Sequence, residues 1–377
     1  MERRQNSDYI PLIGISHGDI NGINYEIIIK ALNDRRMSEM FNCVLYGSSK
    51  MVAYYQNSLD LPRISFNNIR RTDKAQLKKL NILNITQEEI KVETGKSTSH
   101  AGELAYLALE RAVSDLSNNY LQALVTAPID KSNIQSEKFN FAGHTGYLAE
   151  AFKTRDYLML LVADSLRVGV VTAHIPIQEV SAAITKELIL AKLKVLHRSL
   201  EYDFGIKKPR IAVLGLNPHA SDNGLIGKEE EEVIIPAIEE AQRKNMLVFG
   251  PYAADGFFAA RNYQNFDAIL AMYHDQGLIP FKTLSFEEGV NFTAGLPVVR
   301  TSPAHGTAFD IAGKNIASES SMRQAIYLAA DIIANRKEYH SVNRNPLKTK
   351  AQLDKIADED ISSLLAEDVD ENEGLSI

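Results

Sequence analysis

Short apolar runs of strand length alternate with amphipathic stretches of helix length over most of the chain, and this alternation restricts its fold more than any other feature. Three of the apolar runs are residues 121–128 (LQALVTAP), 167–174 (RVGVVTAH) and 266–274 (FDAILAMYH). Helical spacing lies between such runs, for example over residues 101–113 and 186–200. Strands that are apolar throughout are typical of a parallel sheet with helices on both faces. The sequence therefore predicts the α/β class with a largely parallel sheet.

Length and composition narrow the functional classes. The 377 residues exceed what one hydrophobic core usually organises, so two domains are expected. The net charge of −7 leaves no large basic excess for a nucleic-acid backbone. Cys43 is the sole cysteine, which excludes an intrachain disulfide and fits a reducing cytoplasm. We find no apolar run of about 18 residues and no signal peptide, so no membrane span is expected.

Three of the apolar runs end on a histidine. These are His174 in VGVVTAHIP, His219 in IAVLGLNPHA and His274 in AILAMYHDQG. Ligands of parallel α/β sheets bind outside the carboxyl ends of the strands, so the three imidazoles are predicted to converge. Three neutral nitrogen donors suit a divalent cation that keeps positions open for substrate or water. The alternative is that each histidine is an isolated polar residue at a strand end.

Other polar residues at comparable places are candidates for binding anions. His144 and Thr145 stand at the predicted entrance to a helix, where unpaired N–H groups favour an anion. Lys282, Asn291 and Arg300 lie in a stretch rich in glycine and polar residues, and an arginine can hold phosphate or carboxylate through two hydrogen bonds. The alternatives are an ordinary N-cap for Thr145 and solvated surface positions for the two cations.

Six motifs resemble one known family, that of 4-hydroxythreonine-4-phosphate dehydrogenase in pyridoxal-phosphate synthesis. The motifs are TAPIDK, FAGHTGYLAE, VTAHIP, GLNPHA, AMYHDQGL and GVNFTAGLPVVRTSPAHGTAFDIAG. The resemblance runs from about residue 10 to about residue 335. It implies two α/β/α domains with a cleft between them, like isocitrate and isopropylmalate dehydrogenases. It also implies a homodimer that binds NAD or NADP without the G-x-G-x-x-G fingerprint, which this sequence lacks.

The resemblance places the domain boundaries as well. Residues 1–130 and 285–340 are expected to form a discontinuous first domain. Residues 131–284 would form the second domain, which carries the metal histidines and the dimer contacts. Residues 341–377 are polar and end acidic, and we expect them to be a C-terminal extension.

The functional residues of the family match positions of this chain. The resemblance implies a metal site shared between subunits, with Zn²⁺, Mg²⁺ or Co²⁺ as the ion, and a site for a phosphorylated hydroxy-amino acid. The implied metal ligands are His174, His219 and His274. The implied substrate contacts are His144, Thr145, Lys282, Asn291 and Arg300.

Three positions depart from the pattern of the family. Ile20 and Asn24 stand where a proline and a second glycine are common, which is expected to alter the stiffness of the loop. Gly146 stands where a glutamate commonly follows the His-Thr pair, so a carboxylate near the substrate is missing. None of the three is an implied metal ligand.

The implied reaction oxidises the C3 alcohol of 4-phosphooxy-L-threonine to 2-amino-3-oxo-4-phosphooxybutanoate, which loses CO₂ to give 3-amino-2-oxopropyl phosphate. Lys131 and Asp255 are both candidates for the general base, and the residues do not rank them. The alternatives are a dehydrogenase of D-threonate or D-erythronate 4-phosphate, a metal-dependent phosphatase or aldolase, and a non-catalytic protein that binds a phosphorylated metabolite.

Overall fold

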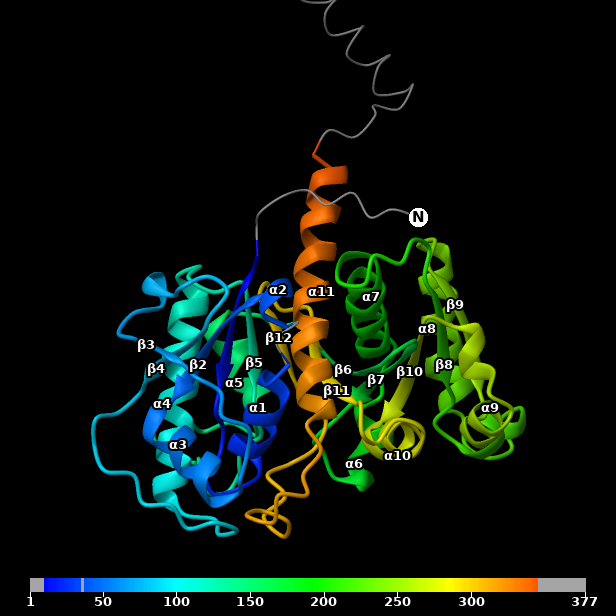
Figure 1. Cartoon of the computed structure of the whole chain (residues 1–377). Coiled ribbons are helices and arrows are strands. Elements are labelled where there is room, and N and C mark those ends of the chain that lie inside the picture. Colours follow the sequence, from blue (N-terminus) through cyan, green and yellow to red (C-terminus); the bar gives the residue numbers. More distant parts are fainter. Residues whose placement is uncertain (1–9, 35–36, 345–377) are drawn as a thin grey trace, which may run out of the picture. The chain divides into compact units, whose positions relative to one another are not determined.

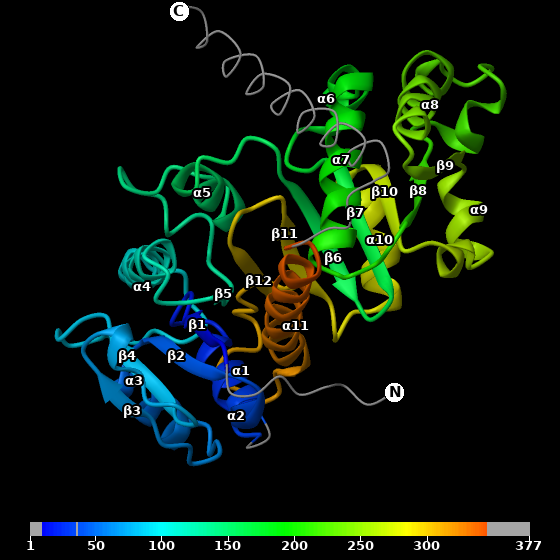
Figure 2. The same ribbon diagram turned by 90° about the horizontal axis from the view of Figure 1, so that it is seen from above.

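The computed structural model describes residues 10–34 and 37–344. Within them, twelve strands form one sheet with the order β3-β4-β2-β1-β5-β12-β11-β6-β7-β10-β8-β9. The strands are β1 (Leu12–Ser16), β2 (Asn42–Gly47), β3 (Asn67–Ile69), β4 (Leu80–Asn84), β5 (Ala123–Thr126), β6 (Leu158–Ala163), β7 (Leu166–Thr172), β8 (Arg210–Leu214), β9 (Leu247–Tyr252), β10 (Ala268–Tyr273), β11 (Val290–Ala294) and β12 (Val299–Pro303). Figure 2 shows this sheet spread across the molecule from β3 to β9.

The sheet has two parallel sections joined by an antiparallel middle. Strands β3, β4, β2, β1, β5 and β12 are parallel to one another, as are β7, β10, β8 and β9. Between these sections, β12, β11, β6 and β7 pair antiparallel. The predicted α/β class is confirmed, and the antiparallel middle is an addition to it.

The reversal between β6 and β7 has a local cause. Only Asp164 and Ser165 connect the two strands, and Asp164 has a φ of 47°. A parallel pair needs a crossover of a dozen or more residues, so a connection of two residues permits only a hairpin.

Helices cover both faces of the sheet (Figure 1). They are α1 (Asn24–Leu32), α2 (Met37–Met40), α3 (Ser49–Ser58), α4 (Ser99–Ser117), α5 (His144–Ala151), α6 (Ile177–Ala183), α7 (Lys186–Tyr202), α8 (Ile235–Arg243), α9 (Ala254–Ala259), α10 (His274–Leu284) and α11 (Ser320–Val342). The described residues up to Arg336 form one compact unit, and residues 337–344 belong to a second unit. Most of the predicted C-terminal extension, residues 345–377, lies outside the described residues.

The two faces of the sheet are covered differently. On one face, α1, α3, α7, α8 and the part of α11 up to Arg336 share a single core that includes Ile28, Leu193 and Ile326. On the other face there are two separate clusters, one under α4 and α5 and one under α9 and α10. Strands β12 and β11 contribute no residue to either of these clusters, which leaves this face of the two strands free to line a cavity.

The predicted domain split follows the strand order. Strands β1–β5, β11 and β12 belong to the predicted first domain, and β6–β10 belong to the second. The division would fall between β11 and β6, which pair over five residues of each strand. The split itself stays a prediction.

Candidate functional site

A cavity of about 670 Å³ lies over the antiparallel middle of the sheet. Its floor is built from alternate residues of four strands, because successive side chains of a strand point to opposite faces. These residues are Met159 and Leu161 on β6, Val170 and Thr172 on β7, Asn291 on β11, and Arg300 and Ser302 on β12.

Strand register brings the polar members of this floor together. Asn291 pairs with Ser302 on one side and with Leu161 on the other. Phe292 pairs with Thr301, so Thr293 comes opposite Arg300 on the face that carries Asn291. Polar side chains therefore gather on one face at the centre of the sheet.

Arg300 is a buried cation at this centre, with 2% of its surface exposed. Its Nε and Nη2 donate to the hydroxyl of Thr126 at 3.0 and 2.7 Å, and its Nη1 donates to the hydroxyl of Thr293 at 3.4 Å. Burial lowers the pKa of Arg300 to about 9. No ion pair of Arg300 with a carboxylate is found among the described residues, so its charge is available to an anion in the cavity.

His144 and Thr145 begin α5 at the side of the cavity. The preceding Gly143 has a φ of 155°, a conformation that favours glycine and turns the chain into the helix. His144 is buried, and its Nε2 has no partner. Burial and the charges of Arg300 and Lys131 hold the pKa of His144 well below its usual value, so the ring is neutral at pH 7.

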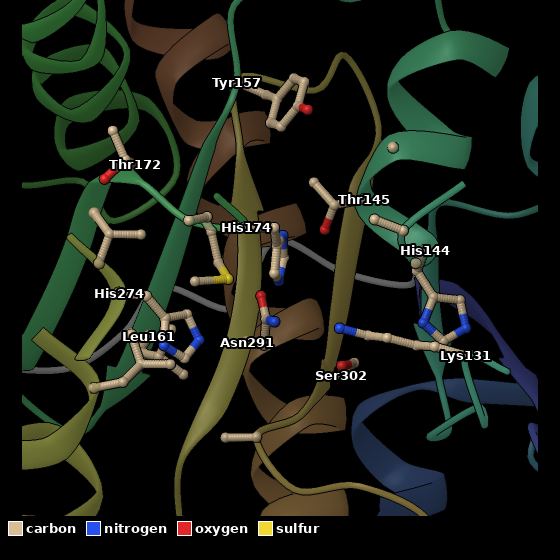
Figure 3. A pocket seen from close by; sticks show the side chains of 18 of the residues that line it. Lys131, His144, Thr145, Tyr157, Leu161, Thr172, His174, His274, Asn291 and Ser302 are labelled. Atoms are coloured by element: carbon tan, nitrogen blue, oxygen red, sulfur yellow. The ribbon is translucent and has the colours of Figure 1, made fainter. Parts of the chain in front are cut away.

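Two lysines add positive charge to the same cavity. Lys131 and Lys282 both line it. Figure 3 shows Lys131 pointing from the side of His144 toward the middle of the cavity, where Asn291 and His174 lie. All five predicted substrate contacts line this cavity, although what they bind stays a prediction.

His174 and His274 lie together on the opposite side of the cavity (Figure 3). They follow the neighbouring parallel strands β7 and β10, and their ring centroids are 6.1 Å apart. Nδ1 of His274 contacts Oδ1 of Asp275 at 2.7 Å, which leaves Nε2 of that ring for a ligand. Burial, Lys131 and His274 lower the pKa of His174. A neutral imidazole such as that of His174 suits a metal ion.

The third predicted histidine is placed elsewhere. His219 is exposed in a short helical turn after β8 and does not line the cavity. Residues 219–223 all have positive φ, so the chain turns away there instead of continuing past the strand end. Over residues 10–34 and 37–344, no group of three His, Cys, Asp or Glu side chains is close enough to hold a metal ion. The predicted triad is therefore not assembled within one chain.

The two candidate bases are also separated. Lys131 lines the cavity, whereas Asp255 lies exposed on α9 and does not. His305 and Lys192 line the cavity as well, although no role was predicted for either of them from the sequence. His305 stands in the motif TSPAHGTAF, so its neighbours offered a signal. Lys192 lies on an amphipathic helix, where the pattern does not distinguish it from a surface lysine.

The fold and the cavity define an α/β enzyme whose site combines neutral imidazoles with uncompensated cations. Residues 39–329 match the family model described as pyridoxal phosphate biosynthetic protein PdxA. The chain belongs to this family, and the predicted resemblance is confirmed. The predicted oxidoreductase class is confirmed with it, because relatives of the chain are named as dehydrogenases.

Three similar proteins cover most of the chain. The 4-hydroxythreonine-4-phosphate dehydrogenase of Bacteroides thetaiotaomicron is 51% identical over 96% of this chain and 98% of its own length. The putative D-threonate 4-phosphate dehydrogenase of Oceanobacillus iheyensis is 38% identical over 85% of this chain and 98% of its own. The crystal structure of 4-hydroxythreonine-4-phosphate dehydrogenase from Klebsiella pneumoniae has a TM-score of 0.75 at 34% identity, covering 87% of this chain and 99% of that one.

Within the described part of the chain, no helix is both long and apolar enough to cross a bilayer.

Proposed function

We propose that the chain oxidises 4-phosphooxy-L-threonine to 2-amino-3-oxo-4-phosphooxybutanoate with NAD or NADP as oxidant, and that the product decarboxylates to 3-amino-2-oxopropyl phosphate. The observation that carries the proposal is the cavity in which Arg300, Lys131 and Lys282 face two imidazoles. A substrate with a phosphate and a carboxylate would supply the anions that this group of cations lacks. The 51% identical relative of the same name supports the choice of substrate.

The residues of the chain would contribute mainly binding and orientation. Arg300 and Lys282, with His144 and Thr145, would hold the phosphate and carboxylate ends. Anchoring both ends fixes the C3–H bond in one direction, which converts binding energy into orientation. A nicotinamide cofactor would take the hydride from C3.

The proton of the C3 hydroxyl needs an acceptor as the ketone forms. Of the two candidate bases we favour Lys131, since it reaches into the cavity and Asp255 does not. In this role Lys131 would act as the neutral amine, and Arg300 and Lys282 would then supply the positive charge that holds the anionic groups. The decarboxylation that follows breaks the bond between C2 and the carboxylate. The electron pair then moves toward the C3 ketone, and CO₂ leaves.

The imidazole pair fits a divalent cation, because both rings lie at the cavity and Nε2 of His274 is free to coordinate. His174 and His274 would hold the ion, and His219 of a second subunit would complete the set in the proposed homodimer. Such an ion supplies Lewis acidity, which lowers the pKa of an alcohol. We further propose that the enzyme works in the cytoplasm.

D-threonate 4-phosphate is the second candidate substrate. The relative from Oceanobacillus iheyensis favours it. This substrate also has a phosphate and a carboxylate, and it lacks the amino group, so the cations alone do not separate the two. Gly146, which lines the cavity and brings no carboxylate of its own, leaves no acidic group at this position for the substrate ammonium.

A panel of phosphorylated hydroxy acids tests the proposal. The purified protein is depleted of metal, and Zn²⁺, Mg²⁺ or Co²⁺ is added back with NAD or NADP. We expect nicotinamide absorbance at 340 nm to rise fastest with 4-phosphooxy-L-threonine, and only after metal is restored. A faster rise with D-threonate 4-phosphate would favour the second candidate. Turnover without any nicotinamide would contradict both.

A further inference from the structure

The hydroxyl of Thr126 has an unusual pair of contacts at the centre of the site. Thr126 ends β5, and its Oγ1 accepts hydrogen bonds from both Nε and Nη2 of Arg300. Strand pairing explains the contact. Arg300 on β12 pairs with Leu124, and Thr126 lies two residues further along the same face. Thr126 is itself fully buried.

The contact with Thr126 occupies only part of the hydrogen-bond donors of Arg300. A guanidinium has five N–H groups. Thr126 takes the one on Nε and one on Nη2, and Thr293 takes one on Nη1. One N–H remains on each terminal nitrogen, and such a pair can bind two oxygens of a single phosphate or carboxylate.

The hydrogen-bond partners of Arg300 are neutral hydroxyl groups, so they do not cancel its positive charge. A carboxylate in the place of Thr126 would form a buried ion pair and neutralise the guanidinium. A hydroxyl satisfies two donors and leaves the full positive charge in place. The cavity thus contains an oriented cation without a counter-ion.

We propose that Thr126 is a positioning residue that orients Arg300, so that its terminal nitrogens bind an oxyanion group of the substrate. Thr293 supports the same orientation through its longer contact. The proposal rests on the proposed function for the identity of the substrate, but the binding of an oxyanion can be tested without turnover.

Substitutions of Thr126 and Thr293 separate the effect of the hydroxyl group from the effect of the side-chain shape. Thr126→Val keeps the shape of the side chain and removes the hydroxyl, and Thr126→Ser keeps the hydroxyl. Thr293→Val removes the weaker contact and serves as the second test if Thr126→Val does not fold. Thr301→Val is the matched control, because Thr301 is a buried threonine on β12 beside Arg300 that donates to the carbonyl of Ala325 instead.

We expect Thr126→Val to raise KM for 4-phosphooxy-L-threonine about tenfold, the effect of one charge-assisted hydrogen bond, with kcat changed much less. Thr126→Ser should restore most of the affinity. Thr293→Val should change KM in the same direction but less, and Thr301→Val should leave KM unchanged. An unchanged KM in Thr126→Val, or an equal rise in Thr301→Val, would overturn the proposal.

A binding experiment keeps this result separate from the proposed function. Phosphate and acetate are titrated separately against each variant, and the rise of the unfolding midpoint with anion concentration gives the affinity. We expect Thr126→Val to weaken the binding of one anion, which identifies the group that Arg300 holds. If the wild-type protein binds phosphate but reduces no nicotinamide, the proposed function fails while the role of Thr126 is still decided. Wild-type protein that binds neither anion would overturn the role of Thr126.

Discussion

The imidazole of His17 has a pKa far from its ordinary value, because the side chain is buried. It is 1% exposed, its Nδ1 has no partner, and its ring stacks on that of Tyr25 with centroids 5.5 Å apart. Tyr25 in turn stacks on Tyr55. Burial, partly opposed by backbone hydrogen bonds, lowers the pKa of His17 from 6.5 to about 4. The neutral ring is thus part of the core beside the β1–α1 loop.

The pH dependence of stability follows from this pKa. Between pH 6.5 and 4 the unfolded chain binds a proton at His17 that the folded protein does not. The free energy of unfolding is therefore fully retained above pH 6.5 and falls as the pH is lowered. At pH 5 the loss from this residue is about 2 kcal/mol. Urea unfolding of wild type and His17→Gln at pH 7.5 and pH 5 measures it.

We expect the stability difference between the two proteins to shift by about that amount in favour of His17→Gln at pH 5. The comparison cancels the other titrating groups, since they are common to both. An identical pH dependence in the two proteins would show that His17 titrates normally.

Asn24 shows how a single departure from the family pattern is accommodated. Its side-chain Nδ2 donates to the carbonyl oxygens of Asp19 and Pro128, at 2.9 and 2.7 Å. Both contacts are buried, so the asparagine ties the β1–α1 loop to the segment after β5. The expected change in the stiffness of this loop stays a prediction, and these two contacts favour a more rigid loop.

At the scale of elements, α4 packs closely against the segment that carries Lys131, and there is no space for a side chain at Gly102. Gly102 lies in the first turns of α4, and a Cβ there would come within 2.1 Å of the carbonyl oxygen of Asn133. Asn133 also donates to Asp19 through its side chain at 2.8 Å. Helix α4, the β1–α1 loop and the segment from Asp130 to Asn133 are therefore packed as one group.

Two glycine-to-alanine changes test this packing. Alanine is favoured over glycine within a helix by up to about 1 kcal/mol. Gly102→Ala should nevertheless destabilise the protein by about 1–3 kcal/mol, the usual cost of overpacking, and should reduce turnover by moving Lys131. Gly256→Ala on α9 is the control, because a Cβ there has no neighbour within 4 Å. It should leave stability unchanged or raise it slightly. Unfolding midpoints give both values, and a stable, active Gly102→Ala variant would contradict the argument.

At the scale of the whole molecule, the placement of the histidines provides a test of the proposed homodimer. His174 and His274 share the cavity of one chain, and His219 does not reach it. A shared site requires His219 to come from a second copy. Inactive chains with defects at different histidines should then complement each other.

Co-expression of His174→Ala with His219→Ala tests this arrangement. In a mixed dimer, one site lacks two ligands, and the other site has all three. With random pairing, about a quarter of wild-type activity should return, although each variant alone is inactive. His174→Ala mixed with His274→Ala is the control and should stay inactive, since both changes affect the same chain's share of the site. Activity in the control mixture, or none in the test mixture, would exclude this division of ligands.

Much of the cavity lining could be predicted from the sequence, because the carboxyl end of a strand can be recognised from a short apolar run that ends in polar residues. His174 and His274 follow apolar runs, and neighbouring parallel strands bring such ends together. All five predicted substrate contacts line the cavity for a related reason, since they stand at or near the ends of elements. His219 was predicted from the same pattern, and its role as a ligand from a second subunit stays a prediction. Within one chain it does not line the cavity, because the positive φ angles after Pro218 redirect the chain, and no residue pattern indicated them. The position of Asp255 away from the cavity was equally invisible in the sequence.

The amino-acid sequence by itself determined the α/β class and the family, because these depend on local periodicity and on short motifs. Only the tertiary structure decided which strands are neighbours, and with them the antiparallel middle of the sheet and the hydroxyl partners of Arg300. The physical reason is that hydrogen bonding between strands joins residues more than a hundred positions apart in the sequence. Burial in the folded protein then sets the charge state of the titratable side chains.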